Sequence, residues 1–331
     1  MVKFLIYLIF CVVVPMLSIS NCANEPPPPA SKAGQVPKDL SQTLPPRSAI
    51  GVDKLADAET HYNRGISYQA QGAFDEAIRE FEEAVRLRPD YAQAYNNIGT
   101  SYQFQGNFDQ AISAYKRAIE VQPELVEAHH NLGTIYLMQG QIDAAIVAYK
   151  EVIRLRPRLA QAYVDIGRAY GLGGRLDEAL PEFKKAVELD PNLALAHYAL
   201  GAAYRHKGLL DESIIALKRA IQLLDGQPVG LPLQTQAYLN LGYVYRDKGL
   251  LGEAIEAFKA VNRLDGKNDE AYHELGVTYT KQEAYAKAIV AFEAALKIKP
   301  DAVQTQNALR VAQARLARQQ MSNQAIEGSS K

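Results

Sequence analysis

The chain of 331 residues has only two cysteines and almost no net charge. Both cysteines, Cys11 and Cys22, lie near the N-terminus, so the rest of the chain has no internal disulfide and no thiolate for catalysis or metal binding. The formal net charge is −1, whereas a nucleic-acid-binding protein is expected to show a basic balance or a basic stripe. We therefore expect no nucleic acid among its partners.

Sequence motifs of the common enzyme classes are also missing. The chain contains no phosphate-binding loop, no nucleophile elbow and no zinc-ligand spacing. Its carboxylates are abundant but scattered, so no acid–base pair stands out. These absences predict a protein that is not an enzyme, with no catalytic residue, metal, cofactor or small-molecule substrate.

A glycine recurs every 34 residues through most of the chain, with one interval that is seven residues longer. A fixed period of this length indicates stacked repeats rather than a compact enzyme fold. We call these residues the reference glycines: Gly65, Gly99, Gly133, Gly167, Gly201, Gly242 and Gly276.

Other residue types recur in phase with the reference glycines. Tyr68, Gly72, Ala77 and Phe81 follow Gly65, and later copies keep tyrosine, glycine, alanine and an aromatic residue at most of these positions. This pattern resembles the tetratricopeptide repeat (TPR), a helix–turn–helix unit of 34 residues. The resemblance implies an all-α fold, a right-handed α-solenoid of seven helix pairs plus a C-terminal capping helix. The expected repeats are 58–91, 92–125, 126–159, 160–193, 194–234 with the insertion, 235–268 and 269–302.

The recurring residues have a physical reason within a helix pair. Glycine on the first helix and alanine on the second allow the two helices to approach closely. The second glycine of each repeat, such as Gly72, is expected to close the first helix in the left-handed conformation. Each of the following aspartates is expected to accept hydrogen bonds from N–H groups at the start of the second helix: Asp75, Asp109, Asp143, Asp177 and Asp211.

The N-terminal segment predicts export from the cytoplasm. Residues 1–21 combine one lysine with an apolar run and are typical of a signal peptide or membrane anchor. Residues 19–22 resemble a bacterial lipobox, which makes Cys22 a lipidation candidate, although Asn21 departs from the motif. The alternatives are an ordinary cleaved signal and an uncleaved anchor. Residues 22–57 are rich in proline and predict a disordered linker that tethers the repeats to a membrane.

Two further segments lie outside the regular repeats. We expect residues 303–320 to form a capping helix, with Val303, Leu309, Ala312 and Leu316 on one apolar face, followed by a disordered tail at 321–331. The insertion at 226–234 is expected to be a loop. Its apolar residues either tuck against the solenoid or bind a partner.

The resemblance to TPR proteins also implies a ligand groove. In that family the first helices line a concave surface, and residues two before each glycine face into it. Here these positions include Asn63, Asn97, Asn131, Asp165 and Asn240, a polar ladder suited to the backbone of an extended peptide. We expect the four asparagines to face solvent, so that truncating them costs little stability. The alternative is that asparagine is merely tolerated on a solvated face.

Other residues are expected in or near the same groove. The candidates beside the ladder are Tyr62, Asn96, Tyr198, Arg168, Arg205 and Arg246. Three histidines, His61, His129 and His197, occupy a position held by tyrosine in other repeats, and we interpret them as packing substitutes rather than metal ligands.

These features predict a non-catalytic protein–protein interaction scaffold of the bacterial cell envelope. The resemblance extends to envelope TPR lipoproteins, and the expected partner is a protein or an extended peptide. Membrane contact is expected through the N-terminal lipid or anchor, with the repeats in an extracytoplasmic, periplasmic location. The alternative is an accessory subunit that presents a substrate to a separate enzyme or export system.

Overall fold

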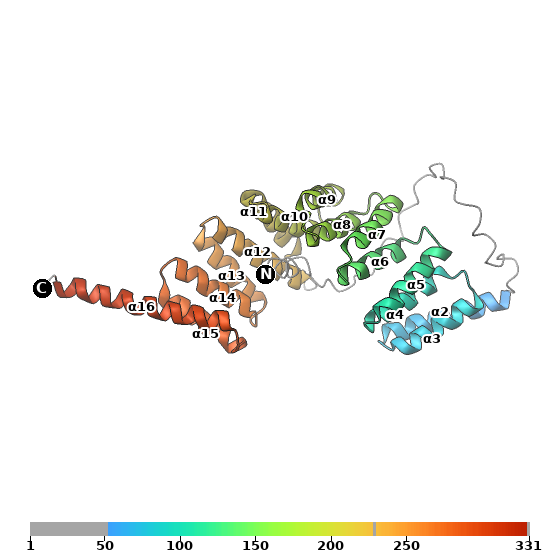
Figure 1. Ribbon diagram of the computed structural model, residues 1–331, viewed down its shortest axis with the longest axis horizontal. Coiled ribbons are helices and arrows are strands. Elements are labelled where there is room, and N and C mark those ends of the chain that lie inside the picture. The colour runs from blue at the N-terminus through green and yellow to red at the C-terminus, as the bar shows by residue number, and fades with distance from the viewer. Residues whose placement is uncertain (1–51, 228–229, 330–331) are drawn as a thin grey trace. The chain divides into compact units, whose positions relative to one another are not determined.

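The computed structural model describes residues 52–227 and 230–329. In these ranges it has fifteen α-helices and no strand (Figure 1), which confirms the predicted all-α fold. The described chain divides after Gly173 into two compact parts. We call residues 52–173 the N-terminal unit and the described residues from 174 to 329 the C-terminal unit.

Within each unit, every helix packs against the helices before and after it in the sequence. The N-terminal unit comprises α2 (Val52–Ala70), α3 (Phe74–Leu87), α4 (Ala92–Phe104), α5 (Phe108–Val121), α6 (Val126–Met138), α7 (Ile142–Leu155) and α8 (Ala160–Leu172). The C-terminal unit comprises α9 (Leu176–Leu189), α10 (Ala194–His206), α11 (Leu210–Leu224), α12 (Leu231–Asp247), α13 (Leu251–Leu264), α14 (Asp269–Lys281), α15 (Tyr285–Ile298) and α16 (Val303–Ser329). Even-numbered helices up to α14 are the first helices of repeats.

Six of the seven reference glycines are required because a large side chain lies directly on each of them. A Cβ atom added to Gly133 would lie 2.7 Å from the ring of Tyr149, sixteen residues later on the second helix. Equivalent contacts of 2.5–2.7 Å join Gly65 to Phe81, Gly99 to Tyr115, Gly201 to Leu217, Gly242 to Phe258 and Gly276 to Phe292. These large side chains are fully buried. The large side chain over each of these glycines therefore sets the distance between the two helices of the repeat.

The turn after each first helix depends on a left-handed residue. The glycine there has a positive φ in six repeats, for example 74° at Gly72 and 82° at Gly249. The prediction of left-handed glycines is thus confirmed. The last repeat has Glu283 at this turn, with a φ of 60°, a conformation that side chains with a Cβ rarely adopt.

The prediction that the aspartates cap the second helices is wrong. Those helices begin one residue earlier than the aspartates, and the capping residues before them, such as Ala73 and Asn107, make no side-chain cap bond. Asp75 and its equivalents instead lie in the first turn of the second helix, where their negative charge interacts favourably with the helix dipole. Asp177 and Asp211 form ion pairs with Lys207 and Lys248 of the following repeat.

The loop within the insertion is shorter than expected. Helix α12 begins at Leu231, so residues 231–234 are helical rather than part of a loop. Leu233 packs against the core of the C-terminal unit, whereas Leu231 is 42% exposed. The other apolar residue of the segment, Val229, lies outside the described residues.

The repeat array begins and ends with longer helices than predicted. Helix α2 starts at Val52, so residues 52–57 are helical and do not belong to a disordered linker. Helix α16 continues to Ser329, which corrects the predicted disorder from residue 321. Ala312 is fully buried and Leu309 packs beside it, but Val303 is 64% exposed and does not share their face. The predicted signal, lipobox and most of the linker lie outside the described residues.

Candidate functional site

The predicted polar ladder joins neighbouring first helices. The Nδ2 of Asn97 donates to the Tyr62 hydroxyl at 3.1 Å, and the Nδ2 of Asn131 donates to Oδ1 of Asn96 at 3.0 Å. In both pairs a residue two before one reference glycine bonds to a residue three before the previous one, 35 positions earlier. These bonds hold α2, α4 and α6 in register.

The same pairing continues with buried partners. In the N-terminal unit, His130 and Asp165 lie 3.1 Å apart, and Asp165 is only 4% exposed. In the C-terminal unit, Asn240 donates to the Tyr198 hydroxyl at 3.3 Å, and each of these residues is 3% exposed. The expectation that the asparagines of the ladder face solvent is therefore wrong for Asn240, and Asp165 at the same repeat position is buried as well.

The accessible part of the ladder lies near its start. Asn63 is exposed, and Asn97 and Asn131 are half-buried. The structure thus brings the ladder residues together as inter-repeat contacts, a role that the sequence interpretation missed. The sequence did contain a signal for this role, because each ladder residue after Asn63 has a polar residue 35 positions earlier, or 42 positions earlier where the insertion intervenes.

His130 and Asp165 form a charged site within the N-terminal unit. Burial lowers the pKa of His130, but the hydrogen bond and negative charge of Asp165 outweigh burial, so the pKa is raised overall. Asp165 also accepts a hydrogen bond from Gln161 at 3.0 Å and lies 3.8 Å from Arg168. This cluster stabilises the contact between α6 and α8.

The predicted groove arginines of the C-terminal unit also have partners. Arg205 pairs with Asp247 at 3.1 Å, and Arg246 forms an ion pair with Glu274. Both guanidinium groups stack on Tyr243, at 4.7 and 5.3 Å from the ring centroid. Burial, Glu274 and Glu270 raise the pKa of the Tyr243 hydroxyl. The positive charge of both arginines is therefore balanced within the repeats.

Two apolar side chains that the sequence interpretation did not single out project from first helices of the N-terminal unit. Phe104 and Met138 occupy the same repeat position and are 55% and 51% exposed. Phe104 stacks on Phe74 with a centroid distance of 5.1 Å, and Met138 lies 3.9 Å from the amide of Gln103. The signal in the sequence was an apolar residue five positions after the glycine. We call Phe74, Phe104 and Met138 the apolar strip.

Models of one repeat family match most of the helical chain. Models described as tetratricopeptide repeat or TPR repeat match residues 56–124, 90–158, 167–208, 194–223, 242–283 and 269–302. Together these ranges cover more than half of the chain. The chain belongs to the tetratricopeptide repeat family.

Solved TPR structures share the fold. A chain of the APC/C hetero-tetramer Cut9–Hcn1 aligns with a TM-score of 0.61 at 20% identity over 75% of this chain, which spans only 48% of that structure's chain. A TPR protein from Parabacteroides merdae aligns with a TM-score of 0.59 at 17% identity, over 78% of this chain and 99% of that one. MamA aligns with a TM-score of 0.45 at 29% identity, over 48% of this chain and 93% of the MamA chain. No curated protein matches the sequence.

The histidines of the TPR repeats have a more specific role than packing. The Nε2 atoms of His129 and His197 lie 2.8 and 2.9 Å from the carbonyl oxygens of Pro123 and Pro191, six residues earlier. The hydroxyl of Tyr163 donates to the Pro157 carbonyl in the same way, at 2.9 Å. Histidine therefore replaces tyrosine as a hydrogen-bonding partner of the inter-repeat turn. His61 instead pairs with Glu80 at 2.7 Å.

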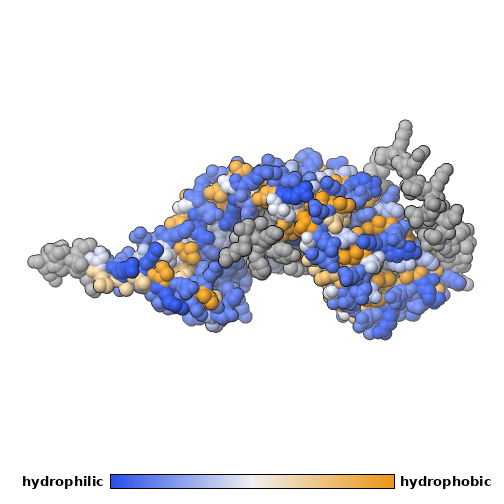
Figure 2. Space-filling view, viewed as in Figure 1, coloured by the Kyte–Doolittle hydropathy of each residue, from blue (hydrophilic) through white to orange (hydrophobic). Residues whose placement is uncertain are grey.

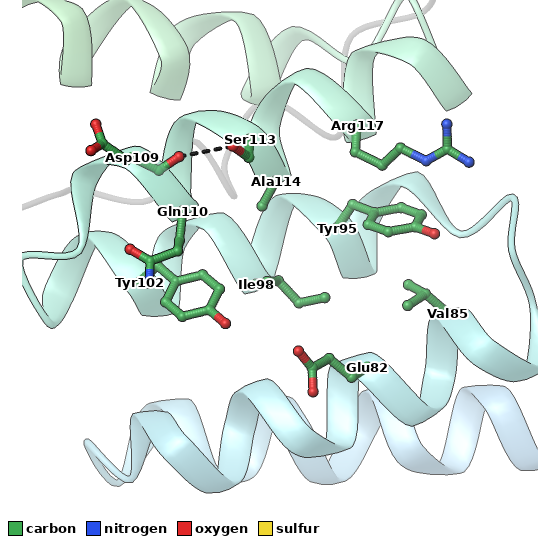
Figure 3. Close-up of a pocket in the computed structure, with 10 residues that line it drawn as sticks. All are labelled: Glu82, Val85, Tyr95, Ile98, Tyr102, Asp109, Gln110, Ser113, Ala114 and Arg117. Carbon is green, nitrogen blue, oxygen red and sulfur yellow. Dashed lines mark hydrogen bonds between the residues drawn. The ribbon is translucent and has the colours of Figure 1, made fainter.

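The surface of the described TPR repeats is mixed in polarity (Figure 2) and contains a cleft. Among the described residues, no group of three or more histidine, cysteine or acidic side chains is placed to hold a metal ion. None of the helices in those ranges combines the length and apolar character needed to cross a membrane. Figure 2 shows apolar patches set in a mostly hydrophilic surface. One cleft of about 440 Å³ opens between α3, α4 and α5 (Figure 3).

Proposed function

We propose that this TPR protein is a non-catalytic scaffold of a bacterial cell envelope, which holds an extended segment of a partner protein against its first helices. The observation that carries the proposal is the apolar strip. Phe104 and Met138 remain more than half exposed, while most other periodic apolar positions are buried. Exposed apolar side chains that gather in register are typical of protein interaction sites.

The chemistry around the strip favours an uncharged partner segment. Helix α4 contains no charged residue, and Glu127 is the only acidic or basic residue of α6 apart from two histidines. A neutral surface compensates little of the cost of removing a charged side chain from water. Packed helices lie about 8–10 Å apart, which an extended chain spans in about three residues. We expect apolar partner residues at that spacing.

The first test removes the apolar strip from the surface. The variant Phe104→Ser/Met138→Ser should capture its partner from envelope extracts about thirtyfold less well, because each of the two side chains contributes roughly 1 kcal/mol when its exposed area is buried. Its melting temperature should stay near that of the wild-type protein. Mass spectrometry of the captured proteins would separate structural assembly components from an enzyme or transporter served by an accessory subunit.

A matched control comes from Val147, which is 64% exposed on α7 and lies outside the strip. Val147→Ser should leave capture unchanged. If the double variant captures as well as the wild-type protein, the partner docks elsewhere and the strip is not the site.

The envelope location rests on the N-terminal sequence. An apolar run precedes Cys22, and a proline-rich segment separates it from the repeats. In this proposal Cys22 is the lipidated first residue of the mature protein, which then sits on the membrane with its repeats on the periplasmic side. Mass spectrometry of the mature N-terminus should find a diacylglyceryl group on Cys22. An unmodified terminus beyond residue 22 would exclude a lipoprotein and leave a secreted form.

A further inference from the structure

The cleft in Figure 3 has an apolar floor and a carboxylate at its edge. Ile98 lies in the floor, with Tyr95 and Tyr102 on either side of it along α4. Val85 and Glu82 project from α3 toward α4. The cleft can therefore hold the stem of a long side chain with its end near Glu82.

Glu82 has no ion pair or hydrogen bond among the described residues. Two neighbouring arginines are engaged elsewhere. Arg86 pairs with Glu83 at 2.7 Å, and Arg117, which also lines the cleft, pairs with Glu120 at 2.9 Å and lies 5.7 Å from the ring centroid of Tyr95. Burial raises the pKa of the Tyr102 hydroxyl, and the negative charges of Glu82 and Asp75 raise it further. Glu82 and Tyr102 thus form an electronegative end of the cleft, and Arg117 lies at the opposite end, beside Tyr95 (Figure 3).

Other repeats provide that cation from their own sequence. The position of Glu82, seventeen residues after the reference glycine, is lysine in the next five repeats: Lys116, Lys150, Lys184, Lys218 and Lys259. In the C-terminal unit, the ammonium of Lys184 lies 5.8 Å from the ring centroid of Tyr204, and that of Lys218 lies 5.8 Å from Tyr245. Both tyrosines are equivalent to Tyr102. A lysine over this tyrosine is therefore a regular feature of the repeats, reversed in charge at Glu82.

We propose that the cleft between α3, α4 and α5 binds a lysine side chain presented by a partner protein. The stem would lie on Ile98 and Val85, and the ammonium would sit over Tyr102 beside Glu82. This supplies from outside the contact that Lys184 and Lys218 make within the chain. The inference rests on the proposed role in protein binding but uses a different surface, because no residue of the apolar strip lines the cleft.

The test is a titration of the full chain with two short peptides, acetyl-Ala-Lys-Ala-amide and its norleucine analogue. Norleucine keeps the apolar stem and removes the charge. NMR of isoleucine methyl groups, with Ile98 assigned through Ile98→Val, should show saturable shifts with the lysine peptide at millimolar concentration. The norleucine peptide should bind at least about fivefold more weakly, since it forms neither the ion pair nor the cation–π contact. Equal shifts from both peptides, or no shift from the lysine peptide, would overturn the proposal.

Charge variants provide the second arm. Glu82→Lys restores the lysine of the other repeats, so it should fill the cleft from within and abolish the peptide-induced shift at Ile98. Glu293→Lys changes the equivalent residue of the last repeat and should leave the shift intact. An unchanged titration of Glu82→Lys contradicts the inference. If the peptide titrations fail while the wild-type protein still captures its envelope partner through the apolar strip, the lysine site alone has failed and the proposed scaffold role stands.

Discussion

Replacing Gly133 by leucine is expected to lower the melting temperature of the N-terminal repeats by about 10 °C. The new side chain would start 2.7 Å from the ring of Tyr149, which is buried and has no room to withdraw. Overpacking of this kind costs about 3 kcal/mol, and a domain of this size loses a few degrees per kcal/mol. In stacked repeats the loss also weakens the interfaces with neighbouring repeats. Thermal unfolding followed by circular dichroism measures the effect.

The matched control is Gly252→Leu on α13. A Cβ at Gly252 meets nothing within 4 Å, so leucine there removes a helix-destabilising glycine without a clash. This variant should melt at or slightly above the wild-type temperature. If Gly133→Leu and Gly252→Leu have the same melting temperature, the Tyr149 ring does not set the distance between the two helices of the repeat.

Replacing Asn240 by alanine is expected to destabilise the C-terminal unit by about 2 kcal/mol. The change removes a buried amide whose Nδ2 donates to the Tyr198 hydroxyl at 3.3 Å and to the Gln236 carbonyl at 3.1 Å. Each such hydrogen bond contributes about 1 kcal/mol. By contrast, Asn63→Ala should stay within about 0.5 kcal/mol, because Asn63 is exposed. Denaturant unfolding of the two variants gives the comparison.

A double-mutant cycle with Tyr198→Phe isolates the contact. Removing both polar groups should cost less than the sum of the two single changes, because each single change already removes the bond between Asn240 and Tyr198. Strict additivity would mean that Asn240 acts mainly through its other bond, to the Gln236 carbonyl at 3.1 Å.

The sequence predicted those parts of the fold that depend on one residue type at a fixed period. The reference glycines and the left-handed turn glycines fall where the period places them, because no other residue fits under a ring or adopts a positive φ cheaply. The ends of the array were less predictable. Helices α2 and α16 extend beyond the repeat unit, where no periodic signal marks the boundary.

The candidate site was harder to predict, because a polar residue on a first helix can face either solvent or the next repeat. Asn63 and Asn240 occupy the same repeat position, yet one is exposed and the other is 3% exposed. The difference lies in the preceding repeat, which supplies Tyr198 for Asn240, whereas no repeat among the described residues precedes Asn63. Whether such a residue is exposed or buried therefore depends on its partner residue in the preceding repeat, and a single sequence position does not reveal it.

The final helix also limits how the protein can associate with itself. Repeat arrays expose an interface at each end, and head-to-tail joining of such ends builds open filaments. In α16 the position of the reference glycine is held by Arg310, which is exposed. The ring of an incoming second helix could cover that position only by removing the charged Arg310 side chain from water, which is costly. Head-to-tail stacking through this position of α16 is therefore disfavoured, although Val311 beside it is 50% exposed.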